Sequence, residues 1–397
     1  MNFAAFLLLI FILQFMNMKY KFINKISTTI FTVFVLINIV AAQDISISKL
    51  KFISDYEVPH NYSFKGTTVG GLSGIDYDKE KKLYYMISDD RSAVNPARYY
   101  SSKIVFNDKK IDTVLFVDVT TFLNADNKPY PNSKQDPWHT PDPEALRYNP
   151  ITKQMFWTSE GERIVNKKDT VLENPAITII HPDGKYIDTF PLPENLLMHA
   201  TEKGPRQNGT LEGLTFADNF KTMFVNLEEP LYEDGPRADA KKNNAWIRLF
   251  KYDVGTKKNI AQYAYELDPV AYPAIPENAF KINGIPDILS VGKNKLLVIE
   301  RSFSSGRLPC TIKVYLADLN NATNIINTKS LKENPAAHPV IKKLLLNMDD
   351  LKMYTDNIEG VTFGPDLPNG HKSLIFIADN NFMLFEKTQV MLFEVIP

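Results

Sequence analysis

Acidic residues recur at matching points of five similar segments of this chain. In each segment a polar residue enters a short apolar run, a turn follows, and a second apolar run ends on a carboxylate. The first positions are Ser73, Glu144, Glu212, Asp287 and Glu359, and the second are Asp89, Glu160, Glu228, Glu300 and Asp379. The two positions are separated by 16, 16, 16, 13 and 20 residues in the successive segments. This regularity is typical of a repeat architecture.

Carboxylates gathered at one place need compensation, because like charges that lie close together cannot all stay ionised. A hard cation, arginines or protonation can supply it. Calcium suits a set of oxygen ligands in flexible geometry, whereas zinc fits less well because none of the six histidines has a paired ligand spacing. We therefore predict Ca²⁺ ligands at Glu144, Glu160, Glu212, Glu300, Glu359 and Asp379. The alternative is that each acid caps backbone N–H groups and only holds the repeats together.

Arginines lie close to several of these acids. Arg91 follows two aspartates, Arg206 precedes the third segment, and Arg301 follows the fourth carboxylate. A guanidinium can neutralise a carboxylate or hold a phosphate through a forked pair of hydrogen bonds. We predict that these three arginines bind an anionic, oxygen-rich substrate, with salt bridging to the acids as the alternative use.

The sequence contains no Gly-x-Ser-x-Gly elbow of the serine-hydrolase kind. Hydrolysis would then use water activated by a metal, which also shields the charge of the substrate. Asp89, Asp90 and Glu228 are the candidates for taking the proton, and the sequence does not choose among them. His139 enters the second segment beside Trp138 and is a further candidate acid, base or substrate contact. Packing of a loop against the tryptophan is the alternative for His139.

Short runs rich in branched and aromatic residues predict the strands that position these side chains. The acids of one segment begin one strand and end the next, which is the same end of an antiparallel pair. Most segments contain about four such runs. The fifth contains three and finishes at 390–395, whereas a spare alternating run lies at 45–52. We therefore expect the spare run to complete the last sheet.

Four-stranded units that cannot bury both faces alone stack around an axis as the blades of a β-propeller. The predicted fold class is therefore all-β, a propeller of five four-stranded blades closed by the N-terminal strand. The irregular stretches 119–143 and 317–350 leave room for a sixth blade. A two-sheet sandwich is the other alternative, but it does not explain a carboxylate at the same point of every unit.

The first 42 residues are apolar and basic. Two apolar runs, 3–16 and 26–42, flank three lysines. We interpret residues 1–42 as a signal peptide with Met18 as a candidate true start, because the second run has a basic flank and ends on small residues. A two-helix membrane anchor is the alternative, although the first run is short for a span of ~20 residues. The interpretation predicts a secreted or periplasmic domain at 43–397 without a membrane span after cleavage.

Composition narrows the classes of partner. The only cysteine, Cys310, cannot form an internal disulfide, so the exported domain would be held by its hydrophobic core. The chain has 45 basic and 46 acidic residues, and removal of the three N-terminal lysines leaves a mildly acidic domain. That balance disfavours nucleic acid as a partner. We expect a monomer that binds a small anionic ester or phosphoester.

The ordered set of motifs resembles the phytase-like family, described as "esterase-like activity of phytase". The matching motifs are Gly-Leu-Ser-Gly-Ile-Asp at 71–76, Ser-Asp-Asp-Arg at 88–91, Asp-Pro-Glu-Ala at 142–145, Ser-Glu-Gly at 159–161, Arg-x-Asn-x-x-x-Glu-Gly at 206–213, Glu-Arg-Ser at 300–302 and Asn-Ile-Glu-Gly at 357–360. The resemblance extends over roughly residues 50–396. It implies an exported β-propeller hydrolase acting on phosphoesters or other esters, and it implies calcium and phytate only at the level of class.

A function of a different class also fits the sequence. A non-catalytic propeller could bind a surface glycan, peptide or protein and use calcium only for structure, since a fold does not determine a function. Convergence of acids and arginines around a pocket of ligand size would favour the hydrolase. A flat, neutral mouth with every acid paired to backbone would favour the binding module.

Overall fold

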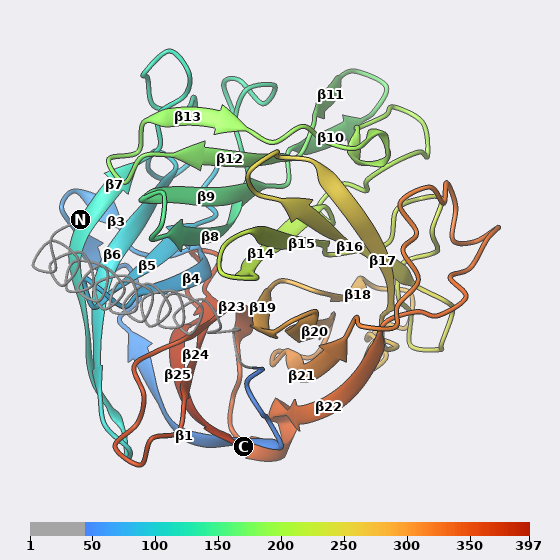
Figure 1. The fold of residues 1–397 in the computed structure, drawn as a ribbon. Helices are drawn as coiled ribbons and strands as arrows, with labels where there is room; N and C mark the ends of the chain where they lie inside the picture. The colour runs from blue at the N-terminus through green and yellow to red at the C-terminus, as the bar shows by residue number, and fades with distance from the viewer. Residues whose placement is uncertain (1–43) are drawn as a thin grey trace, which may run out of the picture. The chain divides into compact units, whose positions relative to one another are not determined.

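The computed structural model describes residues 44–397, which form five antiparallel sheets arranged around a common axis (Figure 1). The predicted signal peptide lies outside the described residues. Each sheet is one blade, and the chain completes the blades in sequence order. The five-bladed propeller is thus confirmed. Neither irregular stretch builds a sixth blade: 119–143 contributes the end of one strand and an isolated bridge, and 317–350 contributes an outer strand and a loop.

Blade 1 consists of β4 (Leu72–Asp78), β5 (Leu83–Ser88), β6 (Arg98–Phe106) and β7 (Ile111–Thr121). Blade 2 consists of β8 (Pro143–Asn149), β9 (Gln154–Ser159), β12 (Ala176–Ile180) and β13 (Tyr186–Thr189). Blade 3 consists of β14 (Leu211–Ala217), β15 (Thr222–Leu227), β16 (Trp246–Asp253) and β17 (Asn259–Glu266). In each of these blades the first strand in sequence is the innermost.

Blade 4 consists of β18 (Lys281–Gly284), β19 (Ile288–Gly292), β20 (Lys295–Ser304), β21 (Thr311–Asp318) and β22 (Ile341–Asn347). Blade 5 consists of β23 (Asn357–Phe363), β24 (Ser373–Asp379), β25 (Thr388–Ile396) and β1 (Lys49–Val58). The remaining elements are the hairpins β2–β3 (Ser63–Phe64, Thr67–Thr68) and β10–β11 (Glu162–Val165, Thr170–Glu173) and the 3₁₀ turns η1 (Glu194–Leu196) and η2 (Met348–Leu351). No helix within residues 44–397 is long and apolar enough to cross a membrane.

The N-terminal strand closes the ring, as predicted. β1 pairs antiparallel with β25, with Lys49 opposite Ile396 and Val58 opposite Thr388. The strand begins and ends later than the expected 45–52. The register shifts between Phe52 and Ser54, and a bulge of this kind interrupts the alternation of apolar and polar residues by which the strand was recognised. The sequence pattern therefore ended before the strand did.

The blades are held together by packing between neighbours. The inner strands β4, β8, β14, β19 and β23 contact one another in order around the axis. The small residue that follows an acid allows this close approach. A Cβ on Gly213 of blade 3 would lie 2.7 Å from the Cα of Asp287 in the neighbouring blade 4. Apolar clusters also cross the blade boundaries: Trp157 of blade 2 packs in one cluster with Tyr85 and Tyr99 of blade 1. Each blade therefore buries its faces against its neighbours.

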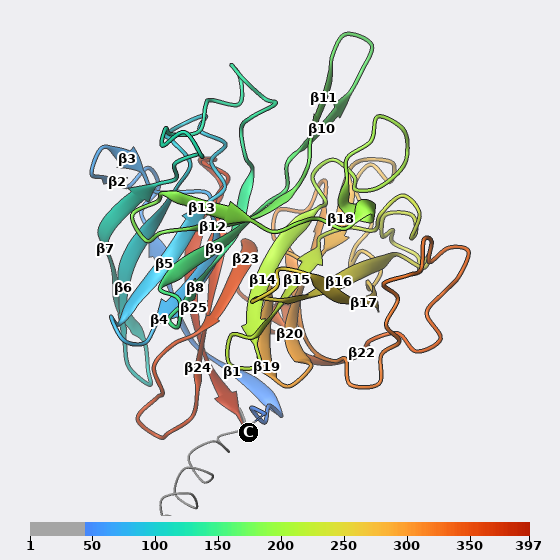
Figure 2. The ribbon, with the colours of Figure 1, turned by 45° about the horizontal axis from the view of Figure 1, so that its top comes forward.

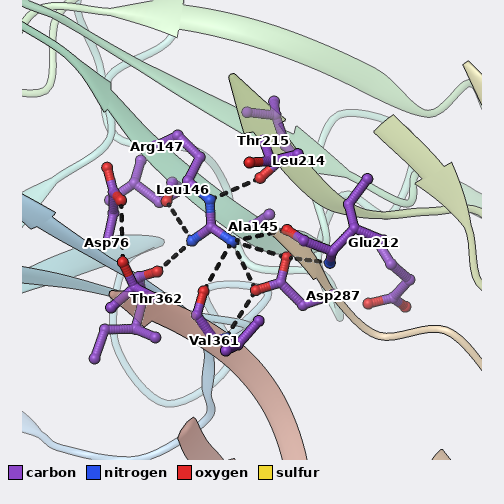
Figure 3. A network of polar contacts seen from close by, with 12 residues as sticks. Asp76, Ala145, Leu146, Arg147, Glu212, Leu214, Thr215, Asp287, Val361 and Thr362 are labelled. Carbon is purple, nitrogen blue, oxygen red and sulfur yellow. Dashed lines mark hydrogen bonds and ion pairs between the residues drawn. The ribbon is translucent and has the colours of Figure 1, made fainter. Parts of the chain in front are cut away.

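A single arginine ties the five blades together at the axis (Figure 3). Arg147 of β8 donates from Nε to the carbonyl oxygen of Leu214 at 2.7 Å and from Nη2 to both carboxylate oxygens of Asp287 at 2.9 and 2.7 Å. It also donates to the carbonyl oxygens of Ile75 and Val361. These partners belong to the four remaining blades. The side chain of Arg147 is only 3% exposed, so the central channel is filled at this level.

Candidate active site

A β-bulge lies at the first acidic position in four of the five blades. The register between the first and second strands shifts at Ser73, at Glu144, at Glu212 and at Glu359. A bulge bends the strand and re-aims the side chain at that point. In the same four blades the second acidic positions lie at or just beyond the end of the paired strand. Both sets of side chains are thereby brought to the same end of the blades.

These side chains meet in a cavity of about 650 Å³. The predicted site residues that line it are Asp89, Glu144, Glu160, Glu212, Glu228, Arg301 and Glu359. The hairpin β10–β11 extends from the body of the propeller (Figure 2). The volume is within the range of small-molecule sites, roughly 300 to 1,000 Å³. The mouth is therefore neither flat nor neutral.

The acids form three groups in which potential ligand atoms lie within 4.8 Å of one another. The groups are Asp142, Glu144 and Glu160; Glu160, Glu212 and Glu228; and Asp89, Glu359 and Asp379. Oxygens on opposite sides of one Ca²⁺ lie about 4.6 to 5.2 Å apart, because each Ca–O bond is about 2.3 to 2.6 Å long. The donor sets are thus of the chemical type and spacing that Ca²⁺ takes. Glu160 belongs to two groups.

Several of these carboxylates have oxygens without a hydrogen-bond partner within the described residues. Asp379 is 0% exposed, and its Oδ2 is buried without a hydrogen bond within residues 44–397. No hydrogen bond in that part of the chain reaches the carboxylates of Glu144 or Glu212, and burial followed by repulsion from neighbouring acids raises the pKa of both. Burial likewise raises the pKa of Asp142 to about 7, although Arg91 opposes the shift. Backbone capping is seen at Glu160, which accepts from Thr210 N at 2.6 Å.

The two adjacent aspartates, Asp89 and Asp90, have different positions. A Cβ on Gly71, whose φ is +62°, would lie 2.1 Å from Asp89 Oδ1, so only glycine allows the carboxylate to lie against that backbone. Asp90, its neighbour, points away and organises the following loop. Its carboxylate accepts from Arg98 Nη1 at 2.8 Å and from the backbone N–H groups of residues 93–95. The structure thus assigns Asp90 to the scaffold, against the prediction that it could take a proton.

Glu300 does not reach the cavity, contrary to the prediction that it binds metal. It accepts hydrogen bonds from Tyr265 Oη at 2.8 Å, Asn283 Nδ2 at 2.8 Å and Lys342 Nζ at 2.5 Å. Blade 4 differs because its first strand is broken into β18 and β19, while β20 continues to Ser304. Glu300 therefore falls within a strand, where alternation turns it outward and turns Arg301 towards the cavity.

Arg301 is the predicted arginine that lines the cavity. Its Nη2 donates to Glu228 Oε1 at 2.6 Å, and its Nη1 donates to Asn357 Oδ1 at 2.6 Å and to Glu359. Its side chain is 13% exposed. Arg301 therefore orients two of the acids that come from different blades.

The other two predicted arginines lie outside the lining. Arg206 donates to the carbonyl oxygens of Pro230 and Gly235 at 3.0 and 2.9 Å, and its guanidinium lies 4.1 Å from the ring centroid of Tyr232. Arg91 forms an ion pair with Glu162 at 2.6 Å and lies 3.6 Å from Asp142. Arg206 therefore packs against a loop, whereas Arg91 pairs with Asp142 of the first acidic group without lining the cavity.

His139 is not at the cavity. Its side chain is 76% exposed and its Nδ1 lies 2.9 Å from the carboxylate of Asp136, three residues earlier. This ion pair on an exposed loop corrects the prediction that His139 is an acid, a base or a substrate contact.

Sequence comparison of the segments missed Asp142 and Arg237, which both line the cavity. Asp142 lies two residues before Glu144, and the corresponding positions of three other segments hold Gly71, Thr210 and Asn357. No repeated signal therefore marked it. Arg237 lies in a loop and forms an ion pair with Glu229 at 2.9 Å.

Comparison with known proteins gives one family and several distant structures. The family model described as "Phytase-like: Esterase-like activity of phytase" matches residues 67–382. A search of the curated proteins gives no match. Solved structures that resemble the chain include an endo-arabinase from Bacteroides thetaiotaomicron VPI-5482, with 13% identity, coverage of 86% of this chain and 98% of that chain, and a TM-score of 0.42. A periplasmic gluconolactonase from Pseudomonas aeruginosa has 11% identity, coverage of 89% and 100%, and a TM-score of 0.39. Resemblances this weak carry no argument about the reaction.

Proposed function

The chain belongs to the phytase-like family, and from this premise we propose that it is a calcium-dependent phosphoesterase whose active site is the acidic cavity. The observation that carries the proposal is the buried Asp379 Oδ2, which has no hydrogen-bond partner within residues 44–397 and lies in a three-acid group at the cavity. The other oxygen, Oδ1, accepts from Asn381 N at 2.9 Å, and a buried carboxylate oxygen left without a partner is costly unless a cation or a proton neutralises it. The two neighbouring three-acid groups extend the same argument across the mouth.

In this proposal Ca²⁺ ions would be held by the acids of the three groups other than Glu228 and Asp89, with Glu160 shared between two groups. When bound, the ions supply positive charge that shields the substrate and polarises a phosphoryl oxygen. The acids of the three groups come from blades 1, 2, 3 and 5, so the cations would also join the blades around the mouth. An anionic ester can approach so many carboxylates only when that charge is neutralised.

We assign Glu228 as the residue that takes the proton from the attacking water. Arg301 holds Glu228 Oε1 at 2.6 Å, and no donor within residues 44–397 hydrogen-bonds its Oε2. Asp89, which also lines the cavity, is the second candidate. The water oxygen forms the new bond to phosphorus, the bond to the alcohol oxygen breaks, and the alcohol leaves with a proton.

Cleavage of a carboxylic ester at the same cavity, and a non-catalytic role in binding a glycan, peptide or protein, are the alternatives that a test must separate. The depth of the cavity and its unpaired acids favour the hydrolase over the binding module. We also propose that the protein is secreted or periplasmic and acts as a monomer, on the strength of its N-terminal sequence pattern and its mildly acidic composition.

The test is hydrolysis of phytate, an aryl phosphate and an aryl acetate by the full chain, with Ca²⁺ and after chelation. We expect phosphate release that requires Ca²⁺ and is lost in Glu228→Gln, while Glu194→Gln, a change at an exposed acid, has no effect. Acetate cleavage that survives chelation would overturn the metal-dependent mechanism. Absence of all turnover, with Ca²⁺ still raising the melting temperature, would make the binding module the better interpretation.

A further inference from the structure

One wall of the cavity is apolar. Five of its lining residues are Phe280, Ile282, Phe303, Leu308 and Cys310. All five belong to blade 4 or to the loops that border its strands β18 and β20. The acidic groups lie on blades 1, 2, 3 and 5. The cavity therefore has an ionic side and an apolar side.

The apolar wall combines a buried base with an exposed edge. Ile282 and Cys310 are 8% and 5% exposed, whereas Phe280 and Leu308 are 53% and 72% exposed. The Phe280 and Phe303 rings lie with their centroids 6.2 Å apart. The pairing of β18 with β20 positions this wall, because it places Ile282 opposite Phe303. Several apolar side chains that line one wall of a cavity indicate contact with a ligand rather than isolated surface exposure.

The basic side chains offer little to a substrate with many phosphates. Among residues 44–397, those that line the cavity are Arg237 and Arg301. Both are already engaged by acids, Arg237 by Glu229 at 2.9 Å and Arg301 by Glu228 at 2.6 Å. A fully polar polyphosphate would therefore leave the apolar wall in contact with water and would find no free guanidinium beyond the acidic groups.

We propose that the substrate is an amphipathic phosphomonoester, with its phosphate at the acidic side and an apolar alcohol portion against the blade 4 wall. The proposal rests on the phosphoesterase function above and adds the substrate class. Water forms the new bond to phosphorus, the phosphorus–oxygen bond to the alcohol breaks, and the alcohol oxygen leaves protonated. The products are inorganic phosphate and an apolar alcohol.

The first experiment measures binding without turnover. Ethyl-, butyl- and hexylphosphonate are titrated into the full chain with Ca²⁺, and the dissociation constants are measured by calorimetry. We expect the dissociation constant to fall by about two- to fourfold for each added methylene, the upper value corresponding to full burial. Equal constants along the series, or no binding by any member, would overturn the proposal.

Variants locate the effect on the wall. Phe280→Ser and Leu308→Ser are expected to flatten the dependence on chain length, with the largest loss of affinity for hexylphosphonate. The matched control is Ile341→Ser, which alters a residue 68% exposed on β22, the outermost strand of the same blade. Ile341→Ser should preserve the full dependence of phosphonate affinity on chain length. A dimer that dissociates in Leu308→Ser would mean that a second copy covers the wall, and it would also overturn the proposal.

Turnover of the matching alkyl phosphates separates this inference from the function on which it rests. Ethyl, butyl and hexyl phosphate have leaving groups of similar reactivity, so kcat/KM should rise with length as the phosphonate affinities do. Length-dependent phosphonate binding without any hydrolysis would reject the phosphoesterase function and support apolar binding at the blade 4 wall. Hydrolysis at the same rate for all chain lengths would support the phosphoesterase function and reject apolar binding at the blade 4 wall.

Discussion

At the scale of single residues, Arg147 and Asp287 form the central contact of the molecule. Asp287 was grouped with the mouth acids by its repeat position, but its carboxylate accepts both bonds from Arg147 Nη2 at 2.9 and 2.7 Å. It also accepts from the backbone N–H of Val361 at 2.9 Å. The acid of the fourth repeat therefore lies at the axis, where it neutralises the buried Arg147.

Removing this acid should destabilise the protein strongly. We expect Asp287→Ala to lower the free energy of unfolding by about 3 to 5 kcal/mol, because Arg147 would be left as a buried unpaired charge. Urea denaturation followed by tryptophan fluorescence measures the change. The control is Asp183→Ala, which removes a solvent-exposed pair with Lys185 and should cost less than about 1 kcal/mol. Similar losses in both variants would contradict the central role of the pair.

Substitutions of Glu160 and Glu300 test which acids bind metal. Glu160 belongs to two groups, whereas Glu300 is held by Tyr265, Asn283 and Lys342 away from the cavity. We expect Glu160→Gln to weaken Ca²⁺ binding at two sites by tenfold or more, roughly the effect of losing one charged ligand. Glu300→Gln should leave Ca²⁺ binding unchanged. Titration calorimetry that shows the opposite order would reject the assignment of the acids.

At the scale of elements, the bulges and the broken strand of blade 4 decide which side chains face the mouth. Four inner strands carry a bulge at the acidic position, and the fifth is divided into β18 and β19. Since alternate residues of a strand point to opposite faces, a change of one position exchanges an acid for its neighbour. In blade 4 this places Arg301 where the other blades have carboxylates.

The closing strand provides a pH-dependent prediction. Glu394 on β25 accepts from Lys51 of β1 at 3.0 Å, from Asn369 at 2.7 Å and from His371, and these hydrogen bonds, led by that from Lys51, lower the pKa of Glu394 to about 2. A lowered pKa contributes stability that is complete above the unfolded value of 4.5 and is lost as the pH falls towards 2.

The expected result is a smaller acid-induced loss of stability in Glu394→Gln than in the natural chain between pH 4.5 and 2. The difference should be only about 1 kcal/mol, because Lys51 is exposed to solvent. Denaturant titrations at pH 6, 4.5, 3 and 2.5 measure it. Parallel pH profiles for the two proteins would show that the contact does not hold the closing strand.

At the scale of the whole molecule, the acidic groups connect neighbouring blades at the mouth. One group joins blades 2 and 3, and another joins blades 1 and 5. Cations bound there would cross-link neighbouring blades at the mouth. Stability and metal binding should consequently be coupled.

Chelation should therefore lower the melting temperature of the full chain, and Ca²⁺ at about 100 times its dissociation constant should restore about 2.7 kcal/mol per site. Differential scanning calorimetry with chelator, Ca²⁺ and Mg²⁺ measures the effect. Mg²⁺ should stabilise less, because it requires stricter octahedral geometry and retains its waters. A melting temperature that is unchanged by chelation would argue that the acids are neutralised by protons instead.

The sequence by itself determined the fold class, the closing strand and the end of the blades at which the acids lie, and it favoured five blades over six. These features depend on local patterns, namely alternating strands, short turns and acids at a fixed spacing, and such patterns are visible along the chain. The resemblance to the phytase-like family followed from the same motifs and is confirmed over residues 67–382.

Only the tertiary structure decided which acids remain unpaired and what faces them. Glu300 is neutralised by Lys342, 42 residues away, and the fate of Asp287 depends on Arg147, 140 residues away. The apolar wall joins Phe280 to Leu308 through the pairing of β18 with β20. Side-chain partners and cavity walls are produced by contacts between segments distant in sequence, so no local pattern carries them.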